Sequence, residues 1–346
     1  MGAGSFCVID NWSTLWLYAD FALCRYRPRD AQDLRLLPVP AAYRETLQSL
    51  HATLAARPDS VRIHFNGHPC RAQRVTTVDG VHYILRALPL ARSLGDLGVP
   101  DAVSAVLLEP SLEGLVLIAG KQGAGKTTLA GALVQARIQR YGGAAQVIED
   151  PPEMAINGVM PYGLIQQIDI HSATAIPSAE RLAWYTRNAV RSSTDMLFMG
   201  EVRGPAEAAA VVLQAGIGGP IITTIHAESV ETALERLMAL AAREMGPEGA
   251  TSQVAAHLAA VVHLTLSSRP VETSRRHSAA PAPLLVLSMQ LLRLRLEDAG
   301  LRSAIERHET AQIQQAAIRR MCGRCRRSRS TPERRIGRGV VRKEAD

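Results

Sequence analysis

The sequence predicts an α/β protein in which a small α+β domain precedes a larger domain built on a mostly parallel sheet. Three observations support this prediction. From residue 101 onward, short apolar runs alternate with helical stretches, a glycine-rich loop joins the first of these runs to a helix, and acidic residues directly follow two later runs. Strands that alternate with helices form parallel sheets, and ligands bind at the carboxyl ends of such strands.

Residues 1–95 are expected to form the small domain. The patterns of Val61–Phe65 and His82–Leu85 predict strands, and Arg44–Ala56 places its leucines on one face of a helix. The stretch Ala91–Pro100 is rich in glycine and turn-forming residues, which is typical of a linker between domains.

The larger domain is expected over residues 96–270, followed by a helical region over 271–317. The expected strands are Gly114–Ala119, Gln146–Ile148, Met196–Met199 and Ile221–Ile225, and the expected helices are Thr127–Arg140, Pro205–Gln214 and Ser229–Ala242. Although the apolar run Leu284–Leu287 has the composition of a buried strand, the longer stretch Leu284–Ala317 is interpreted as one or two helices.

The positive charge of the chain is concentrated in its last segment. Residues 318–346 carry a net charge of +8, whereas the whole chain carries +7, so the rest is close to neutral. We expect this basic tail to be disordered. A contact with acidic lipid, nucleic acid or a partner protein is the alternative. The disordered tail is favoured over such contacts because no aromatic side chains are interleaved with the charges.

Membrane-spanning and disulfide-rich classes are not expected. No apolar run approaches the roughly 18 residues that cross a bilayer, and the first residues do not have the pattern of a signal peptide, which favours a cytoplasmic protein. The five cysteines are scattered, which disfavours a disulfide framework. Cys322 and Cys325 form a lone C-x-x-C motif without two further ligands, so we expect no zinc site.

A phosphate-binding loop is the most specific motif. The segment GKQGAGKT, Gly120–Thr127, fits the pattern G-x-x-x-x-G-K-[ST] and joins an expected strand to an expected helix. Glycines let the backbone N–H groups face phosphates, Lys126 reaches the β- and γ-phosphates, and the hydroxyl of Thr127 binds Mg²⁺. The predicted ligands are therefore ATP and Mg²⁺, and the predicted binding residues are Gly120, Gly123, Ala124, Gly125, Lys126, Thr127 and Thr128.

Two carboxylates and one histidine stand at the ends of later strands. Glu149 follows the expected strand in QVIEDPPE, and Glu201 follows the one in TDMLFMGEVR. Nucleotide hydrolysis needs such groups to hold Mg²⁺ and orient water. We expect Glu149 to act with Thr127 at the metal. His226 ends the strand IITTIH, a position that suits a structural histidine as well as one that senses the γ-phosphate.

These segments, in this order, resemble the secretion ATPase superfamily, which includes PilT-, GspE- and DotB-like motors. The resemblance covers about residues 57–240: GKQGAGKTT is similar to the Walker A motif, VIEDPPE to the Asp box, DMLFMGEVR to Walker B and GGPIITTIHAES to the His box. It implies a RecA-like P-loop NTPase domain over 96–270 and a PAS-like N-terminal domain over 1–95. The ending HAES is closer to the type IV secretion and conjugation branch.

The resemblance also implies roles. Glu201 would activate water with help from Glu149, and His226 would link the γ-phosphate to the sheet. Arg62, Arg86 and Arg203 would meet phosphates at a domain or subunit boundary. The protein would be a homo-hexameric ring, cytoplasmic and peripheral at the inner membrane, that powers type IV secretion, conjugative transfer or a type IV pilus.

Departures from the family pattern keep two alternatives open. Gly204 stands where the family usually has Asp, and Gly218-Gly219 stands where it often has Gly-His. These changes motivate the hypothesis of a nucleotide-gated scaffold that binds ATP with little hydrolysis. The basic tail motivates the other hypothesis, a nucleic-acid-stimulated ATPase of the RecA type.

Overall fold

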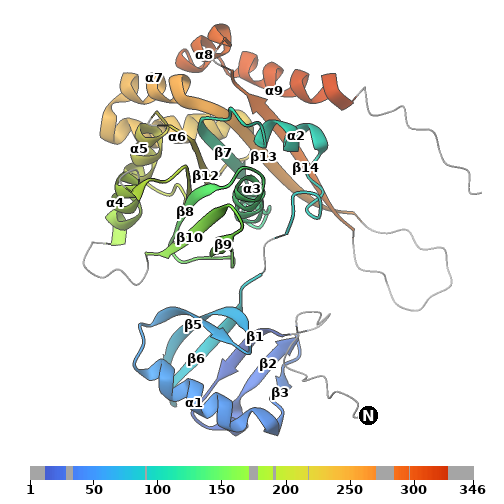
Figure 1. The fold of residues 1–346 in the computed structure, drawn as a ribbon, viewed down its shortest axis with the longest axis vertical. Coiled ribbons are helices and arrows are strands. Elements are labelled where there is room, and N and C mark those ends of the chain that lie inside the picture. Colours follow the sequence, from blue (N-terminus) through green and yellow to red (C-terminus); the bar gives the residue numbers. More distant parts are fainter. Residues whose placement is uncertain are drawn as a thin grey trace, which may run out of the picture.

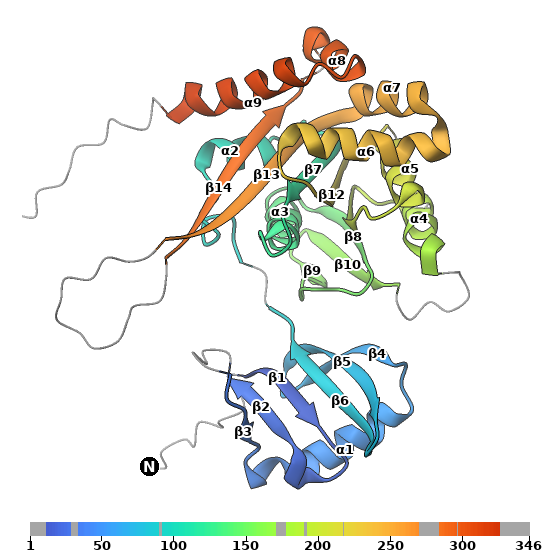
Figure 2. The ribbon, with the colours of Figure 1, turned by 180° about the vertical axis from the view of Figure 1, so that it is seen from behind.

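The structure is a computed structural model that describes residues 12–28, 34–89, 92–170, 178–189, 192–216, 218–269, 284–295 and 297–325. Within these residues the chain forms two packed bodies, each with its own sheet (Figure 1). The view from behind shows the small N-terminal body below the larger one (Figure 2).

The N-terminal body is a six-stranded sheet in the order β3-β2-β1-β6-β5-β4, and all its strand pairs are antiparallel. Its elements are β1 (Trp12–Leu17), η2 (Phe21–Leu23), β2 (Arg25–Pro28), β3 (Leu37–Pro38), η3 (Ala41–Tyr43), α1 (Arg44–Ala55), β4 (Ser60–Phe65), β5 (His68–Thr77) and β6 (Gly80–Ala87). Leu47 and Leu54 of α1 are buried in one core with Trp12 and Leu85 of the sheet, so the predicted apolar face of this helix is confirmed.

The larger body is an eight-stranded sheet in the order β14-β13-β7-β12-β11-β8-β10-β9. Its strands are β7 (Gly114–Gly120), β8 (Gly143–Glu149), β9 (Gly158–Met160), β10 (Gly163–Asp169), β11 (Met196–Glu201), β12 (Pro220–His226), β13 (Leu258–Arg269) and β14 (Leu284–Arg293). The pairs from β13 to β10 are parallel, and only the two edge strands, β14 and β9, pair antiparallel. The predicted mostly parallel sheet is confirmed.

Helices cover both faces of this sheet (Figures 1 and 2). They are α2 (Asp101–Leu107), α3 (Lys126–Tyr141), α4 (Ser178–Ala189), α5 (Pro205–Gln214), α6 (Val230–Met245), α7 (Pro247–His257), α8 (Ala299–Glu306) and α9 (Thr310–Cys325). One core lies between the sheet and α2 and α3, and the other lies between the sheet and α4 to α9. Along β7, Leu115 and Leu117 enter one core while Val116 and Ile118 enter the other, which explains why this strand is apolar throughout.

The expected helix over Leu284–Ala317 is wrong in its first part, because Leu284–Arg293 is strand β14. The strand pairs with β13 along its whole length, from Arg269↔Leu284 to Ala260↔Arg293. Exposed Ser288 and Gln290 alternate with buried Met289 and Leu291, a two-residue period that the leucine-rich composition obscured. Long-range pairing with β13 thus overrides local helix propensity.

The expected tail over 318–346 begins inside a helix, since α9 continues to Cys325. The remaining tail residues, 326–346, and the segment 271–283 lie outside the described residues, so the expectations for them stay predictions. No helix in the described ranges is long and apolar enough to span a bilayer.

Candidate functional site

The glycine-rich loop occupies the carboxyl end of β7, in the middle of the sheet. Gly123 and Gly125 have φ of +75° and +93°, a left-handed conformation that residues with a Cβ rarely adopt. At Gly120 a Cβ would lie 2.6 Å from the backbone oxygen of Leu264 on the neighbouring strand. Glycine is therefore required at all three positions, and α3 starts directly at Lys126.

A cavity of about 510 Å³ opens over this loop and the ends of β11 and β12. It brings together the predicted residues Gly123, Gly125, Lys126, Thr127, Thr128, Glu201, Arg203 and His226, with Gln122, Glu153, Val202, Thr224 and Arg236 completing the lining. Of the other predicted loop residues, Gly120 forms the strand end, and the buried Ala124 packs in the core beneath the loop. The N-terminus of α3 points its free N–H groups and its positive dipole end at a ligand in this position.

Four charged or polar side chains form one chain of contacts along the cavity. The ammonium group of Lys126 donates to the backbone oxygen of Lys121 at 3.1 Å and lies 3.1 Å from Nδ1 of His226. Nε2 of His226 lies 2.7 Å from Oε1 of Glu201, and Nε of Arg203 donates to Oε2 of the same carboxylate at 2.8 Å. This pattern suits the His226 tautomer that carries its proton on Nε2, because Nδ1 must accept from Lys126.

The electrostatics favour an anionic ligand. Burial lowers the pKa of Lys126, against the opposing effect of Glu201 and Glu153. The hydrogen bond to Glu201 is the main cause that raises the pKa of Arg203. The partners of the Lys126 ammonium are a neutral imidazole nitrogen and a carbonyl oxygen, and a phosphate would be a stronger partner than either.

Glu149 lies in an adjoining cavity of about 80 Å³ that shares Thr127, Glu153, Glu201 and Arg203 with the first cavity. Its side chain is only 3% exposed. This burial raises the pKa of Glu149 to about 7, although a hydrogen bond from Gln167 opposes the shift. The Glu149 carboxylate is thus poorly stabilised as an anion by its surroundings.

The small cavity is lined by oxygen donors of the kind that Mg²⁺ prefers, although the described residues contain no preformed group of three acidic, histidine or cysteine side chains that could hold a metal ion. A hydroxyl from Thr127 and the carboxylates of Glu149, Glu153 and Glu201 supply the hard oxygen ligands that this ion prefers. A bound divalent cation would also compensate the buried charge of Glu149. Thr127 and Glu149, the predicted metal residues, therefore border one space.

The three predicted arginines have different surroundings. Arg203 lines the large cavity. Arg62, on β4, reaches Gln167 on β10 by a side-chain hydrogen bond instead of lining the cavity. Arg86 is exposed on β6, and its side chain forms no hydrogen bond or ion pair with the described residues of this single chain. Only one of the three is thus placed at the nucleotide cavity within one protomer.

Sequence reasoning missed Gln167 and Arg236. Gln167 donates to Glu149, and Arg236 of α6 donates to the backbone oxygen of His226 at 3.3 Å. Gln167 lies on β10, a strand that the sequence pattern did not predict, so nothing pointed to it. The position of Arg236 in the expected helix after His226 was the only available signal for that residue.

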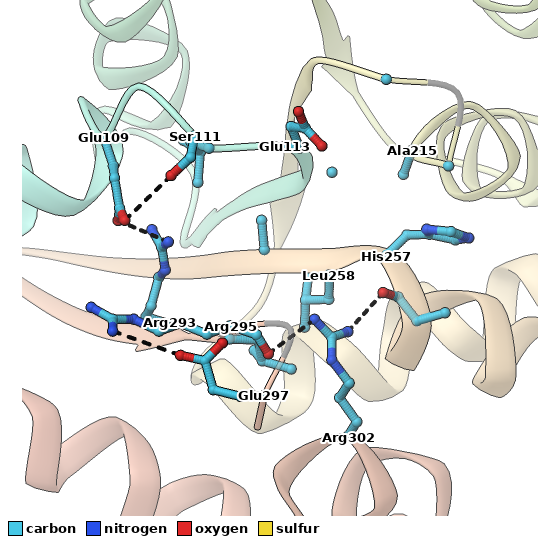
Figure 3. Close-up of a pocket in the computed structure, with 17 residues that line it drawn as sticks. Glu109, Ser111, Glu113, Ala215, His257, Leu258, Arg293, Arg295, Glu297 and Arg302 are labelled. Carbon is cyan, nitrogen blue, oxygen red and sulfur yellow. Dashed lines mark hydrogen bonds and ion pairs between the residues drawn. The ribbon is translucent and has the colours of Figure 1, made fainter. Parts of the chain in front are cut away.

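A second cavity of about 550 Å³ lies at the opposite, amino edge of the sheet (Figure 3). Its arginines are engaged within the fold. Arg293 pairs with Glu109 at 2.8 Å, and Arg302 donates to the backbone oxygens of Ala255 and Ala256 at the end of α7. These contacts give the amino-edge arginines a structural role.

Known proteins have sequences similar to this chain. The family model described as "Type II/IV secretion system protein" matches residues 58–344. The putative type II secretion system protein E of Escherichia coli (strain K12) is 28% identical over 195 residues, which are 55% of this chain and 36% of that protein. Competence protein ComGA of Streptococcus pneumoniae is 32% identical over 131 residues, 38% of each chain. The chain thus spans little more than a third of the length of these two relatives.

Solved structures confirm the fold. The ATPase DotB of Legionella pneumophila superposes with a TM-score of 0.66 at 18% identity, covering 88% of this chain and 84% of that one. The pilus retraction motor PilT with bound ADP gives a TM-score of 0.67 at 20% identity, covering 90% and 86%. The predicted RecA-like P-loop fold with a separate N-terminal sheet is therefore correct, and the family match over most of the sequence shows that this chain belongs to the type II/IV secretion system protein family.

Proposed function

We propose that this protein is an ATP-hydrolysing motor that works as a ring of identical subunits, six by resemblance, on a type IV secretion, conjugation or type IV pilus machine. One observation carries the proposal. The P-loop lysine is linked through His226 to the carboxylate of Glu201, so a phosphate-binding group and a water-activating group meet in one cavity. The family match supports the same class of machine.

Binding of ATP would replace the contacts of Lys126 with neutral groups by stronger contacts with charged phosphates. Lys126 exchanges the Lys121 carbonyl and His226 for the β- and γ-phosphates, while the backbone of Gly123 and Gly125 surrounds the phosphates. This exchange removes the contact between Lys126 and His226. The freed Nδ1 of His226 can donate toward the γ-phosphate once it takes up a proton, which would make the state of His226 depend on the nucleotide.

Hydrolysis would use Glu201 and Glu149. Glu201 accepts a hydrogen bond from the attacking water and takes its proton as the water oxygen bonds to the γ-phosphorus and the bond to ADP breaks. Thr127 and Glu149 would hold Mg²⁺, which neutralises the charge that develops on the phosphate oxygens. Arg203 keeps the carboxylate of Glu201 oriented through their 2.8 Å contact.

The place of action follows from the family. Members act with secretion and pilus machinery, so we propose a location at the cytoplasmic side of the inner membrane, with the machinery as partner. Motion of the N-terminal body relative to the nucleotide body would supply the mechanical work. Arg86, exposed on β6, is available to a neighbouring subunit in such a ring.

The test is the ATPase rate as a function of protein concentration, with particle mass measured by light scattering. We expect turnover per subunit to rise as a ring assembles. A monomer with turnover independent of concentration would contradict a ring motor and favour the nucleic-acid-stimulated ATPase, which DNA should accelerate in a salt-dependent manner.

A second candidate function is the nucleotide-gated scaffold. It is favoured by the engagement of both Glu201 carboxylate oxygens, one by His226 and one by Arg203. If these contacts persisted with ATP bound, Glu201 would be held away from water and hydrolysis would be slow. Rings that bind ATP tightly and have the same low turnover with Glu201→Gln would support the scaffold.

A further inference from the structure

Gln167 connects the two bodies of the molecule through its side-chain amide. The guanidinium of Arg62, on β4 of the N-terminal body, donates to Oε1 of Gln167. The amide nitrogen of Gln167 donates to Oε2 of Glu149 at 2.6 Å and to the backbone oxygen of Met154 at 2.8 Å. One side chain thus touches both the N-terminal body and a carboxylate of the proposed hydrolytic site.

The chemistry of Arg62 and Glu149 fixes the orientation of the Gln167 amide between them. Arg62 is only a donor, so it must face the amide oxygen, and the ionised Glu149 is only an acceptor, so it must face the NH₂ group. A carboxylate at position 167 would repel Glu149, and an apolar side chain would leave Glu149 without this bond. The amide of Gln167 satisfies both neighbours at once, because it carries both an acceptor and a donor.

The backbone holds Gln167 in place. Its N–H donates to the side-chain oxygen of Asn157 at 2.9 Å. On the parallel neighbour β8, Gln167 pairs with Val147, two residues before Glu149. Because residues two apart on a strand share a face, the pairing brings the side chains of Gln167 and Glu149 to the same side of the sheet.

The contact with Arg62 is partly buried. Burial lowers the pKa of Arg62, while Glu149 and Asp169 act in the opposite direction. Breaking a hydrogen bond to a charged group in such surroundings costs more than breaking one at the surface. Docking of the N-terminal body is therefore energetically linked to the Gln167 amide.

We propose that Gln167 is a positioning residue that transmits the docking of the N-terminal body, through Arg62, to the orientation of the Glu149 carboxylate. When the bodies are docked, Arg62 holds the amide and the amide holds Glu149. When they separate, the amide loses one anchor and Glu149 is free to turn. This role rests on the proposed ATPase function, and it differs from a direct contact of Arg62 with phosphate.

The first test measures kcat, KM and the affinity for a fluorescent ATP analogue in Gln167→Leu, Arg62→Met and the double variant, with Gln166→Leu as the matched control on the exposed face of β10. We expect kcat to fall on the order of tenfold or more in both single variants, because a misplaced catalytic group is costly. Affinity should change less than about twofold, and the double variant should be no worse than either single one. Gln166→Leu should match the wild type.

Two results would overturn the relay. The first is a double variant in which the loss of kcat equals the product of the losses in the two single variants, because Arg62 and Gln167 would then act independently. The second is a large loss of nucleotide affinity in Arg62→Met alone, since that would make Arg62 a direct phosphate ligand.

A second test does not need hydrolysis, so it separates failure of the relay from failure of the proposed function. In nucleotide-free protein, hydrogen–deuterium exchange should rise in Ser60–Phe65 and around Met154 in both single variants and stay unchanged in Gln166→Leu. Unchanged exchange in Gln167→Leu would refute the structural link, whatever the ATPase rate.

Discussion

The two edges of the large sheet carry cavities of similar size, about 510 Å³ at the carboxyl edge and about 550 Å³ at the amino edge, but their charges are used differently. At the amino edge, Arg293 and Arg302 satisfy Glu109 and the carbonyls that end α7. At the carboxyl edge, the hydrogen-bond partners of Lys126 among the described residues are the Lys121 carbonyl and Nδ1 of His226, and Gly123 and Gly125 of the glycine loop line the cavity. Cavity volume therefore does not identify a ligand site, whereas a glycine-rich loop with a lysine at the N-terminus of a helix does.

The largest effect is expected at Lys126. Lys126→Ala should weaken ATP binding by a factor on the order of a thousand, because the P-loop ammonium that reaches the phosphates is removed. Fluorescence titration with an ATP analogue measures this, and circular dichroism verifies folding. Unchanged affinity in a folded variant would move the nucleotide site away from the carboxyl edge.

Glu201→Gln should preserve ATP binding and lower kcat by roughly a hundredfold or more, because the amide cannot take the proton from water. Steady-state turnover and binding are measured on the same preparation. A variant with wild-type turnover would remove Glu201 from the hydrolytic role.

Glu149 should make stability depend on pH in protein free of nucleotide and Mg²⁺. Its pKa rises from the ordinary 4.5 to about 7 on folding, so the folded state binds more protons in this interval and the free energy of unfolding falls as pH rises from about 4.5 to 7. The shift corresponds to at most roughly 3 kcal/mol. Glu149→Gln should therefore be more stable than the wild type in urea at pH 8, with the difference shrinking toward pH 4. If the free energy of unfolding depended on pH in the same way in the wild type and in Glu149→Gln, the destabilising buried charge of Glu149 would be contradicted.

The smallest effect is expected at the amino edge. Arg302→Met removes the hydrogen bonds to the last carbonyls of α7 and should cost about 1–2 kcal/mol of folding stability. ATP affinity should not change. A loss of affinity as large as that of Lys126→Ala would erase the distinction between the two edges.

Features that depend on a short segment of the chain could be predicted from the sequence. The P-loop lies within eight residues, and its glycines have local conformational reasons. Glu201 and His226 could be expected to meet because they end strands of one parallel sheet, and β11 and β12 prove to be neighbours.

Features that depend on contacts between segments far apart in the sequence could not be predicted. β14 is a strand because β13 lies beside it, and the importance of Gln167 depends on Arg62, 105 positions away in the sequence. The role proposed for Arg86 depends on a second subunit. No local pattern encodes these relations. The family resemblance correctly indicated the class of protein, and its expectation that Arg62 meets phosphate at a domain or subunit boundary stays a prediction.

The most direct test of the central claim is hydrogen–deuterium exchange of the wild-type protein with and without a slowly hydrolysed ATP analogue and Mg²⁺. We predict protection in Gly120–Thr128 and at the ends of β11 and β12, with no change around Glu109 and Arg293–Arg302. Protection confined to the amino edge, with an unchanged P-loop, would contradict the account.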